Sequence, residues 1–97
     1  MNVQEHLLSC LAEECAEIAQ EVSKALRFGL DNVYPEGSRT VRAKITSEFY
    51  DLVGVIDVLE DNGILQINAA AQSAARAAKR AKLMRFLEYA REQGALQ

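Results

Sequence analysis

Residues 3–28 read VQEHLLSCLAEECAEIAQEVSKALRF, a run without glycine or proline. Its apolar side chains recur at spacings of three and four residues, which is the period of one face of an α-helix. We therefore predict a first helix over residues 3–28, with one apolar stripe facing the core. The stripe consists of Leu8, Leu11, Cys15, Ile18, Val22 and Leu26.

A second helix is predicted over residues 40–62, after a loop that contains the only proline. The hydroxyl of Ser38 or Thr40 can accept a free backbone N–H at its start. The Asp-Asn-Gly sequence at residues 61–63 is typical of a helix end with a left-handed Asn or Gly. The second stripe consists of Val41, Ile45, Phe49, Leu52, Ile56 and Leu59.

A third helical segment, residues 65–93, changes its apolar face part-way along. The two faces do not align on a straight helix, so we predict a bend or break between residues 77 and 82, which would give four helices. No strand-like alternation competes, so the fold class is all-α: an antiparallel helical bundle of three long helices, the last one broken. The first face is Ala71, Ala74, Ala75 and Ala78, and the second is Leu83, Phe86, Leu87 and Ala90.

Length and composition limit the class of protein. A chain of 97 residues fits a single domain, residues 1–97, and 49% apolar content excludes a disordered chain. There is neither a membrane-length apolar run nor a signal sequence, so we expect a cytoplasmic protein without membrane contact. A pI near 5.1 argues against nucleic-acid binding. A bundle this small would leave apolar surface exposed, which favours a homodimer or homotetramer.

Charge is distributed unevenly along the chain. Residues 1–63 carry 12 acids and 5 bases, whereas residues 64–97 carry 2 acids and 6 bases. A metal site in the acidic part with an anionic ligand held by the basic part would explain this asymmetry. Plain attraction between helices would explain it equally well.

Both acidic helices carry two carboxylates three residues apart, one of them beside the apolar stripe. These are Glu14 and Glu17 on the first helix and Glu48 and Asp51 on the second. A carboxylate at a helix seam is costly unless a cation compensates it, and an all-oxygen ligand set suits Mg²⁺ or Mn²⁺. The only histidine, His6, is outside any Glu-x-x-His pair, which argues against a di-iron site. The alternative is a solvated acidic face.

The pattern Glu13-Glu14-x-x-Glu17, followed after 30 residues by Glu48-x-x-Asp51, resembles the MazG-like nucleoside triphosphate pyrophosphohydrolases. The spacer is at the long end for that family. The flanking text, Leu11 to Gln20 and Lys24 to Asp31, is similar to its small single-domain bacterial and phage members. The resemblance covers most of residues 7–60.

The resemblance implies hydrolysis of a nucleoside triphosphate between the α- and β-phosphates, giving a nucleoside monophosphate and pyrophosphate. It implies that Glu14, Glu17, Glu48 and Asp51 hold Mg²⁺, with Mn²⁺ as a substitute. Glu13 matches the first acid of the motif and is the candidate catalytic residue, to orient or deprotonate water. It could instead hold a second metal or face solvent.

Basic side chains are the candidates for binding the triphosphate, and the alternative for each is a solvated or helix-stabilising role. Phe28 could stack on a base or serve in the core. Tyr34, Arg39 and Arg42 border the loop where a lid is expected, while Tyr50 and Asn62 could contact sugar or base. The basic candidates for binding the triphosphate are Lys24, Arg27, Lys79, Lys82 and Arg85.

The competing function is a non-catalytic helical interaction protein.

Overall fold

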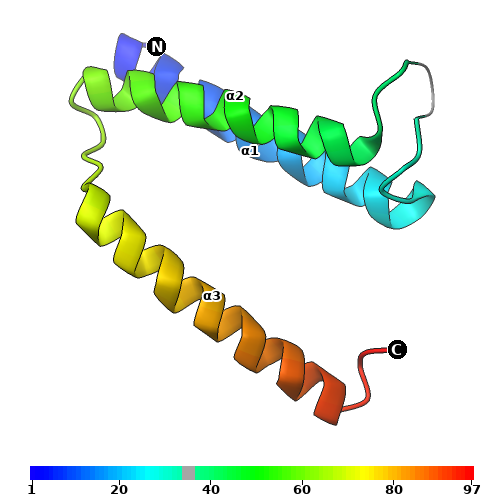
Figure 1. Cartoon of the computed structure of the whole chain (residues 1–97). Helices are drawn as coiled ribbons and strands as arrows, with labels where there is room; N and C mark the ends of the chain where they lie inside the picture. The colour runs from blue at the N-terminus through cyan, green and yellow to red at the C-terminus, as the bar shows by residue number, and fades with distance from the viewer. Residues whose placement is uncertain (34–36) are drawn as a thin grey trace. The chain divides into compact units, whose positions relative to one another are not determined.

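The computed structural model describes residues 1–33 and 37–97, which form three helices and contain no strand. The helices are α1 (Val3–Phe28), α2 (Val41–Asp61) and α3 (Ala69–Glu92). The predicted all-α class is confirmed. α1 and α2 pack side by side in opposite directions (Figure 1). The chain divides into two compact units, residues 1–65 and 66–97. None of the described helices is both long enough and apolar enough to cross a lipid bilayer.

Side-chain caps fix the ends of the first two helices. At the start of α1, Asn2 and Glu5 form a reciprocal capping box that the sequence analysis did not use. At the start of α2, the Thr40 hydroxyl accepts a hydrogen bond from the Ala43 N–H at 3.1 Å, as predicted. α2 ends at Asp61 with Asn62 as its C-cap, and it is Gly63 that adopts the left-handed conformation, with φ of 70°.

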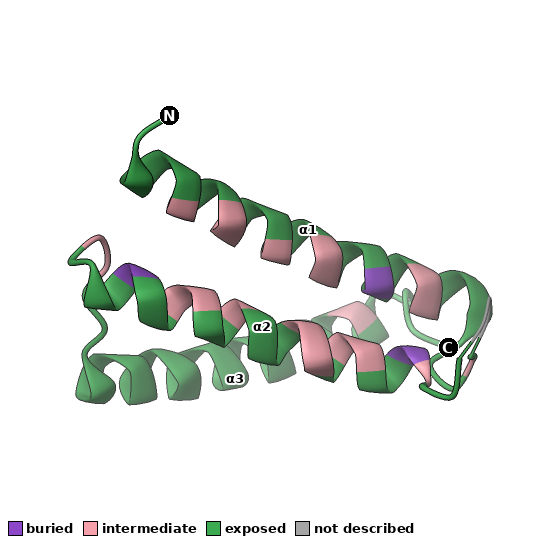
Figure 2. Ribbon diagram, turned by 90° about the horizontal axis from the view of Figure 1, so that it is seen from above, coloured by how far each residue is buried: buried purple, intermediate pink, exposed green. Residues whose placement is uncertain are grey.

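The core of the first unit is the seam between α1 and α2. Figure 2 shows the buried and half-buried residues along the facing sides of the two helices. Seam positions alternate at three and four residues, which is the heptad spacing of antiparallel helix pairs. On α1 they are Leu7, Cys10, Leu11, Glu14, Glu17, Ile18, Glu21, Lys24 and Ala25, and on α2 they are Val41, Lys44, Ile45, Ser47, Glu48, Leu52, Val55, Ile56 and Leu59.

The predicted stripe of α1 is wrong in its rotation about the helix axis. Only Leu11 and Ile18 of that stripe lie in the seam, while Leu26 is 85% exposed. The heptad through Leu7, Leu11 and Ile18 continues through Glu14 and Glu21, so two carboxylates face α2. The apolar pattern alone predicts Cys15 and Val22 at these two seam positions. The predicted stripe of α2 is correct except for Phe49, which is 53% exposed.

α3 is one continuous helix from Ala69 to Glu92, so the predicted break at residues 77–82 is wrong. No glycine or proline interrupts this stretch, and its alanines favour the helix strongly enough to carry it across the change of apolar face. The helix begins at Ala69, later than predicted, because the Asn68 side chain caps it by accepting from the Ala71 N–H at 2.8 Å. None of the residues of α3 is buried.

Candidate metal centre

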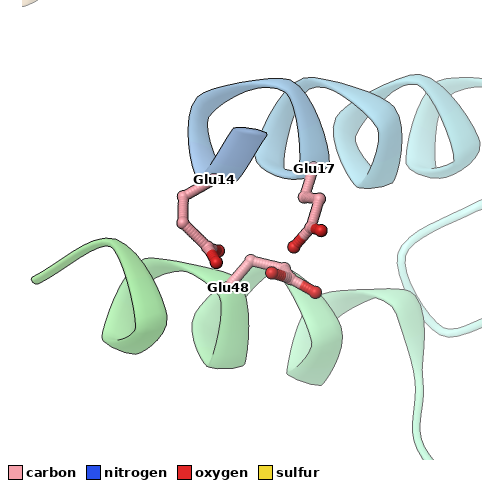
Figure 3. Close-up of side chains that lie close together, drawn as sticks. All are labelled: Glu14, Glu17 and Glu48. Atoms are coloured by element: carbon pink, nitrogen blue, oxygen red, sulfur yellow. The ribbon is translucent and has the colours of Figure 1, made fainter. Parts of the chain in front are cut away.

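Three carboxylates from the two helices converge at the middle of the seam. Glu14 and Glu17, one turn apart on α1, point toward α2, from which Glu48 extends between them (Figure 3). One oxygen of each lies within 4.8 Å of the corresponding oxygens of the other two. We call these three residues the acidic triad. They meet because all three occupy seam positions, where apolar side chains would otherwise pack.

The triad is incompletely satisfied by the protein itself. The Oε2 atoms of Glu14 and Glu48 are both buried and have no hydrogen-bond partner. A buried carboxylate oxygen without a partner costs free energy, because it has lost water and gained nothing in exchange. The arrangement therefore needs a proton or a cation to compensate it.

The electrostatics of the triad favour protonation when no metal is bound. Partial burial, followed by the charges of Asp51 and Glu48, raises the pKa of Glu14 above its ordinary value. A hydrogen bond with Glu48, aided by partial burial and the charge of Glu14, raises the pKa of Glu17 to about 7. Below about pH 7, the triad thus holds a proton that a bound divalent cation would replace.

The donor set fits a hard divalent cation. All three donors are carboxylate oxygens, which suit Mg²⁺ and Mn²⁺, and each can offer an oxygen to the same point. The histidine of the chain is elsewhere on α1, where the His6 Nε2 lies 3.8 Å from the Cys10 Sγ. The triad would hold the cation at the seam, leaving the solvent side for water and substrate oxygens.

Asp51 and Glu13 lie at the margin of the triad. Asp51 is exposed and is not part of the group whose oxygens lie within 4.8 Å, although its charge raises the pKa of Glu14. Glu13 is exposed, and its charge contributes to the raised pKa of both Glu14 and Glu17. The structure thus brings together three of the four predicted metal ligands.

The two candidate cations on α1 already have partners. The Lys24 Nζ lies 3.1 Å from the Glu21 Oε1 in a partly buried ion pair. The Arg27 guanidinium lies over the Phe28 ring, 5.1 Å from its centroid, and both side chains are exposed. The remaining candidate cations are exposed on α3, in the second unit; they are Lys79, Lys82 and Arg85.

Glu21, which was not among the predicted site residues, is the most buried charged residue among those described, at 9% exposed. Its Oε2 atom is buried without a partner, and its other oxygen is bound by Lys24. The signal was its position seven residues after Glu14, which repeats the heptad of the seam. Glu21 therefore extends the line of carboxylates along α1 by one turn beyond Glu17.

We expect Lys24→Met to destabilise the protein by about 1–3 kcal/mol, because it leaves the buried Glu21 carboxylate without its cation. The free energy of unfolding in urea measures this effect. Arg27→Met, an equal loss of charge at an exposed site, should change it by no more than about 0.5 kcal/mol. Adding Glu21→Met to Lys24→Met should recover most of the loss. Equal effects of the two single variants would contradict the role of the pair.

The residues in or near the loop that were predicted to border a lid, together with Asn62, either make local contacts, are exposed, or lie outside the described residues. Tyr34 lies outside the described residues. Arg42 Nε lies 3.4 Å from Asp31 Oδ1, which ties the start of α2 to the end of the preceding turn. Arg39 is exposed. The Asn62 amide donates to the Val58 carbonyl at 2.8 Å and so caps α2.

A groove of about 450 Å³ opens beside the triad, between α1 and α2. Its surface is mainly apolar, and Glu14 and Asp51 are its acidic residues. Tyr50, a candidate contact for sugar or base, forms part of its wall. The residues that line it are Leu7, Cys10, Glu14, Tyr50, Asp51, Gly54, Val55 and Val58.

Comparisons of the chain with protein-family models, with curated proteins and with solved structures found no match.

Proposed function

We propose that this protein is a divalent-metal-dependent nucleoside triphosphate pyrophosphohydrolase of the MazG-like type. The observation that carries the proposal is the acidic triad, in which carboxylates from two helices converge with buried oxygens that lack partners. Such a cluster is unfavourable for the fold alone, and a bound Mg²⁺ or Mn²⁺ would compensate it. The type of reaction is inferred from the Glu-Glu-x-x-Glu and Glu-x-x-Asp patterns of the sequence.

The proposed reaction is hydrolysis of the α–β phosphoanhydride. The oxygen of a water molecule bonds to one phosphorus of this anhydride, and the bond from that phosphorus to the bridging oxygen breaks. The bridging oxygen stays with the other group, so the products are a nucleoside monophosphate and pyrophosphate. When bound, the cation would neutralise charge on the triphosphate and acidify the attacking water. Glu14, Glu17 and Glu48 would hold and orient the cation, and Asp51 adds negative charge beside Glu14. Glu13 is exposed next to the triad and is the proposed acceptor of the proton of the water.

Pyrophosphate release from a panel of ribo- and deoxyribonucleoside triphosphates tests the proposal. We expect release with Mg²⁺ or Mn²⁺, one nucleoside monophosphate for each pyrophosphate, and none in EDTA. Release of orthophosphate and a diphosphate would contradict the cleavage position. A folded, Mg²⁺-supplied protein that cleaves no triphosphate would contradict the proposal itself.

The second candidate is a non-catalytic helical interaction protein. The observation that favours it is the surface of α3, where Leu83, Phe86 and Leu87 are exposed together on one face. This candidate predicts no pyrophosphate release and no specific stabilisation by Mg²⁺, since solvated acids bind the cation weakly and without selectivity. The two candidates are thus separated by the same assay.

Self-association is part of the proposal. In the first unit, large apolar side chains are exposed on both helices, as is typical of subunit interfaces; they include Leu8, Val22 and Leu26 of α1 and Phe49 and Val53 of α2. We propose a homodimer or homotetramer, for which a second copy would cover these faces.

Sedimentation velocity at micromolar concentration should therefore give the mass of a dimer or tetramer. Val22→Lys should shift the protein toward monomer, because it places a charge on the proposed interface. Gln20→Lys, which adds the same charge at an exposed polar position of α1, is the control. A wild-type monomer would contradict the assembly.

A further inference from the structure

Gly54 lies in the middle of α2. Nothing in the described part of the chain explains why this residue is a glycine. It does not have a positive φ, and a Cβ atom built on it would meet nothing within 4 Å. Glycine is the poorest helix former after proline, so alanine would favour this helix more. Neither the backbone conformation nor a neighbouring side chain of the chain therefore explains the residue.

The open space at Gly54 is the groove beside the triad. Leu7, Val55 and Val58 give it apolar surface, and Gly54 contributes bare backbone where a side chain would otherwise enter. Besides the carboxylates of Glu14 and Asp51, the groove has polar groups on Tyr50, in the α2 wall, and on Cys10, on the α1 side. Apolar surface, an aromatic ring and a few polar atoms suit a heterocyclic base.

The groove is in register with the triad along the helix axes. Cys10 lies four residues before Glu14, and Gly54 lies six residues after Glu48. Because α1 and α2 are antiparallel, both steps run in the same direction, and they cover about 6 Å and about 9 Å at 1.5 Å per residue. A ligand whose phosphates are held at the carboxylates would thus place its sugar and base over Cys10 and Gly54.

We infer that this groove is the base and sugar subsite of the nucleotide, with Gly54 as the residue that keeps it open. The inference rests on the proposed nucleotide substrate. A nucleotide fits better than a helix of a second copy, because an apolar helix in the groove would cover the carboxylates of Glu14 and Asp51 without compensating them. The base would stack on the Tyr50 ring and meet the Cys10 Sγ with its edge.

Binding measured by calorimetry with Mg²⁺ tests the subsite independently of cleavage. The probes are α,β-imido analogues of one purine and one pyrimidine nucleoside triphosphate, and imidodiphosphate, which has no base. We expect Gly54→Leu to weaken binding of at least one nucleotide analogue about tenfold or more and to leave imidodiphosphate unchanged. Gly54→Ala should bind with intermediate affinity and unfold at a higher temperature, which keeps the test independent of folding.

Ala43→Leu is the matched control, because it places the same side chain at an exposed position of α2 outside the groove. Equal binding of the nucleotides by wild type and Gly54→Leu would overturn the subsite, as would an equal loss of imidodiphosphate or no binding of the nucleotides by wild type. A changed sedimentation mass for Gly54→Leu would assign the groove to a subunit interface and also overturn it. Base-selective loss of binding in a protein that releases no pyrophosphate would retain the subsite and reject the proposed reaction.

Discussion

Glu48→Gln should eliminate pyrophosphate release and at the same time stabilise the metal-free protein. Glu48 extends from α2 between the two triad carboxylates of α1, so it is the one ligand that joins the helices at the proposed cation. Loss of a charged metal ligand removes several kcal/mol of transition-state stabilisation. That corresponds to a fall in kcat of about a thousandfold or more.

The expected gain in stability comes from the loss of the negative charge of Glu48, as does the expected loss of activity. In the metal-free protein, a hydrogen bond with Glu48 and, to a smaller extent, the charge of Glu48 raise the pKa of Glu17, and the same charge raises the pKa of Glu14. Once the three carboxyl groups are ionised, Glu48 therefore repels both of the others. Glutamine keeps the shape of the side chain, removes the repulsion and can donate a hydrogen bond to a neighbouring carboxylate. In EDTA, the melting temperature of the variant should therefore lie above that of wild type.

Asp57→Asn is the matched control, since it removes one carboxylate charge from an exposed position of the same helix. It should change neither pyrophosphate release nor the melting temperature in EDTA to a comparable extent. A Glu48→Gln protein that keeps wild-type activity would contradict the metal site. A variant that is less stable than wild type in EDTA would assign Glu48 to the fold instead.

Metal-free protein should lose stability as the pH rises from about 4.5 to about 7, and millimolar Mg²⁺ should restore it. The folded-state pKa of Glu17 is about 7, above its ordinary value of 4.5. Between these values the folded protein holds a proton that the unfolded chain has released, so raising the pH favours unfolding. Glu14, whose pKa is also raised, acts in the same direction.

Mg²⁺ reverses the effect because it binds the deprotonated triad of the folded state. At ten times its dissociation constant, a ligand adds about 1.4 kcal/mol to the free energy of unfolding. For a chain of this size this amounts to a rise of roughly 5–10 °C in melting temperature. The stabilisation should be larger at pH 8 than at pH 5, where protons compete with the metal.

Thermal unfolding in EDTA and in Mg²⁺ across this pH range measures both effects. Glu17→Gln should flatten the pH dependence in EDTA and weaken the response to Mg²⁺. Equal stabilisation by Mg²⁺ and by the same ionic strength of sodium chloride would show that the acids are simply screened, and would contradict a specific site.

Local sequence signals predicted α1 and α2 well, but not the start or the continuity of α3. The bounds of α1 were predicted correctly, and those of α2 to within one residue at each end, because caps and breakers act within a few residues. The side of α1 that faces α2 was not predicted correctly. The helix has two candidate apolar faces, and only its packing against α2 selects between them. The selected face carries the glutamates, which hydrophobic periodicity excludes from a core.

The candidate site was predictable to the extent that it lies within one helix pair. Glu14, Glu17 and Glu48 converge as their spacing predicts, and Asp51 lies near Glu14 but outside the group. The ion pair of Lys24 with Glu21 was not predicted, because the number of charges in the sequence does not show that Glu21 is buried. The groove at Gly54 requires both helices in register, so it could not be derived from either segment alone.

The continuity of α3 limits the geometry of whatever contacts it. Its alanine face, centred near Ala75, and its Leu83–Leu87 face are about 120° apart around the axis and about 16 Å apart along it, at 100° and 1.5 Å per residue. A helix without glycine or proline transmits rotation and translation along its length as a rigid rod. Two surfaces that cover these faces would therefore be held at a fixed distance and angle, and a shift of one would move the other.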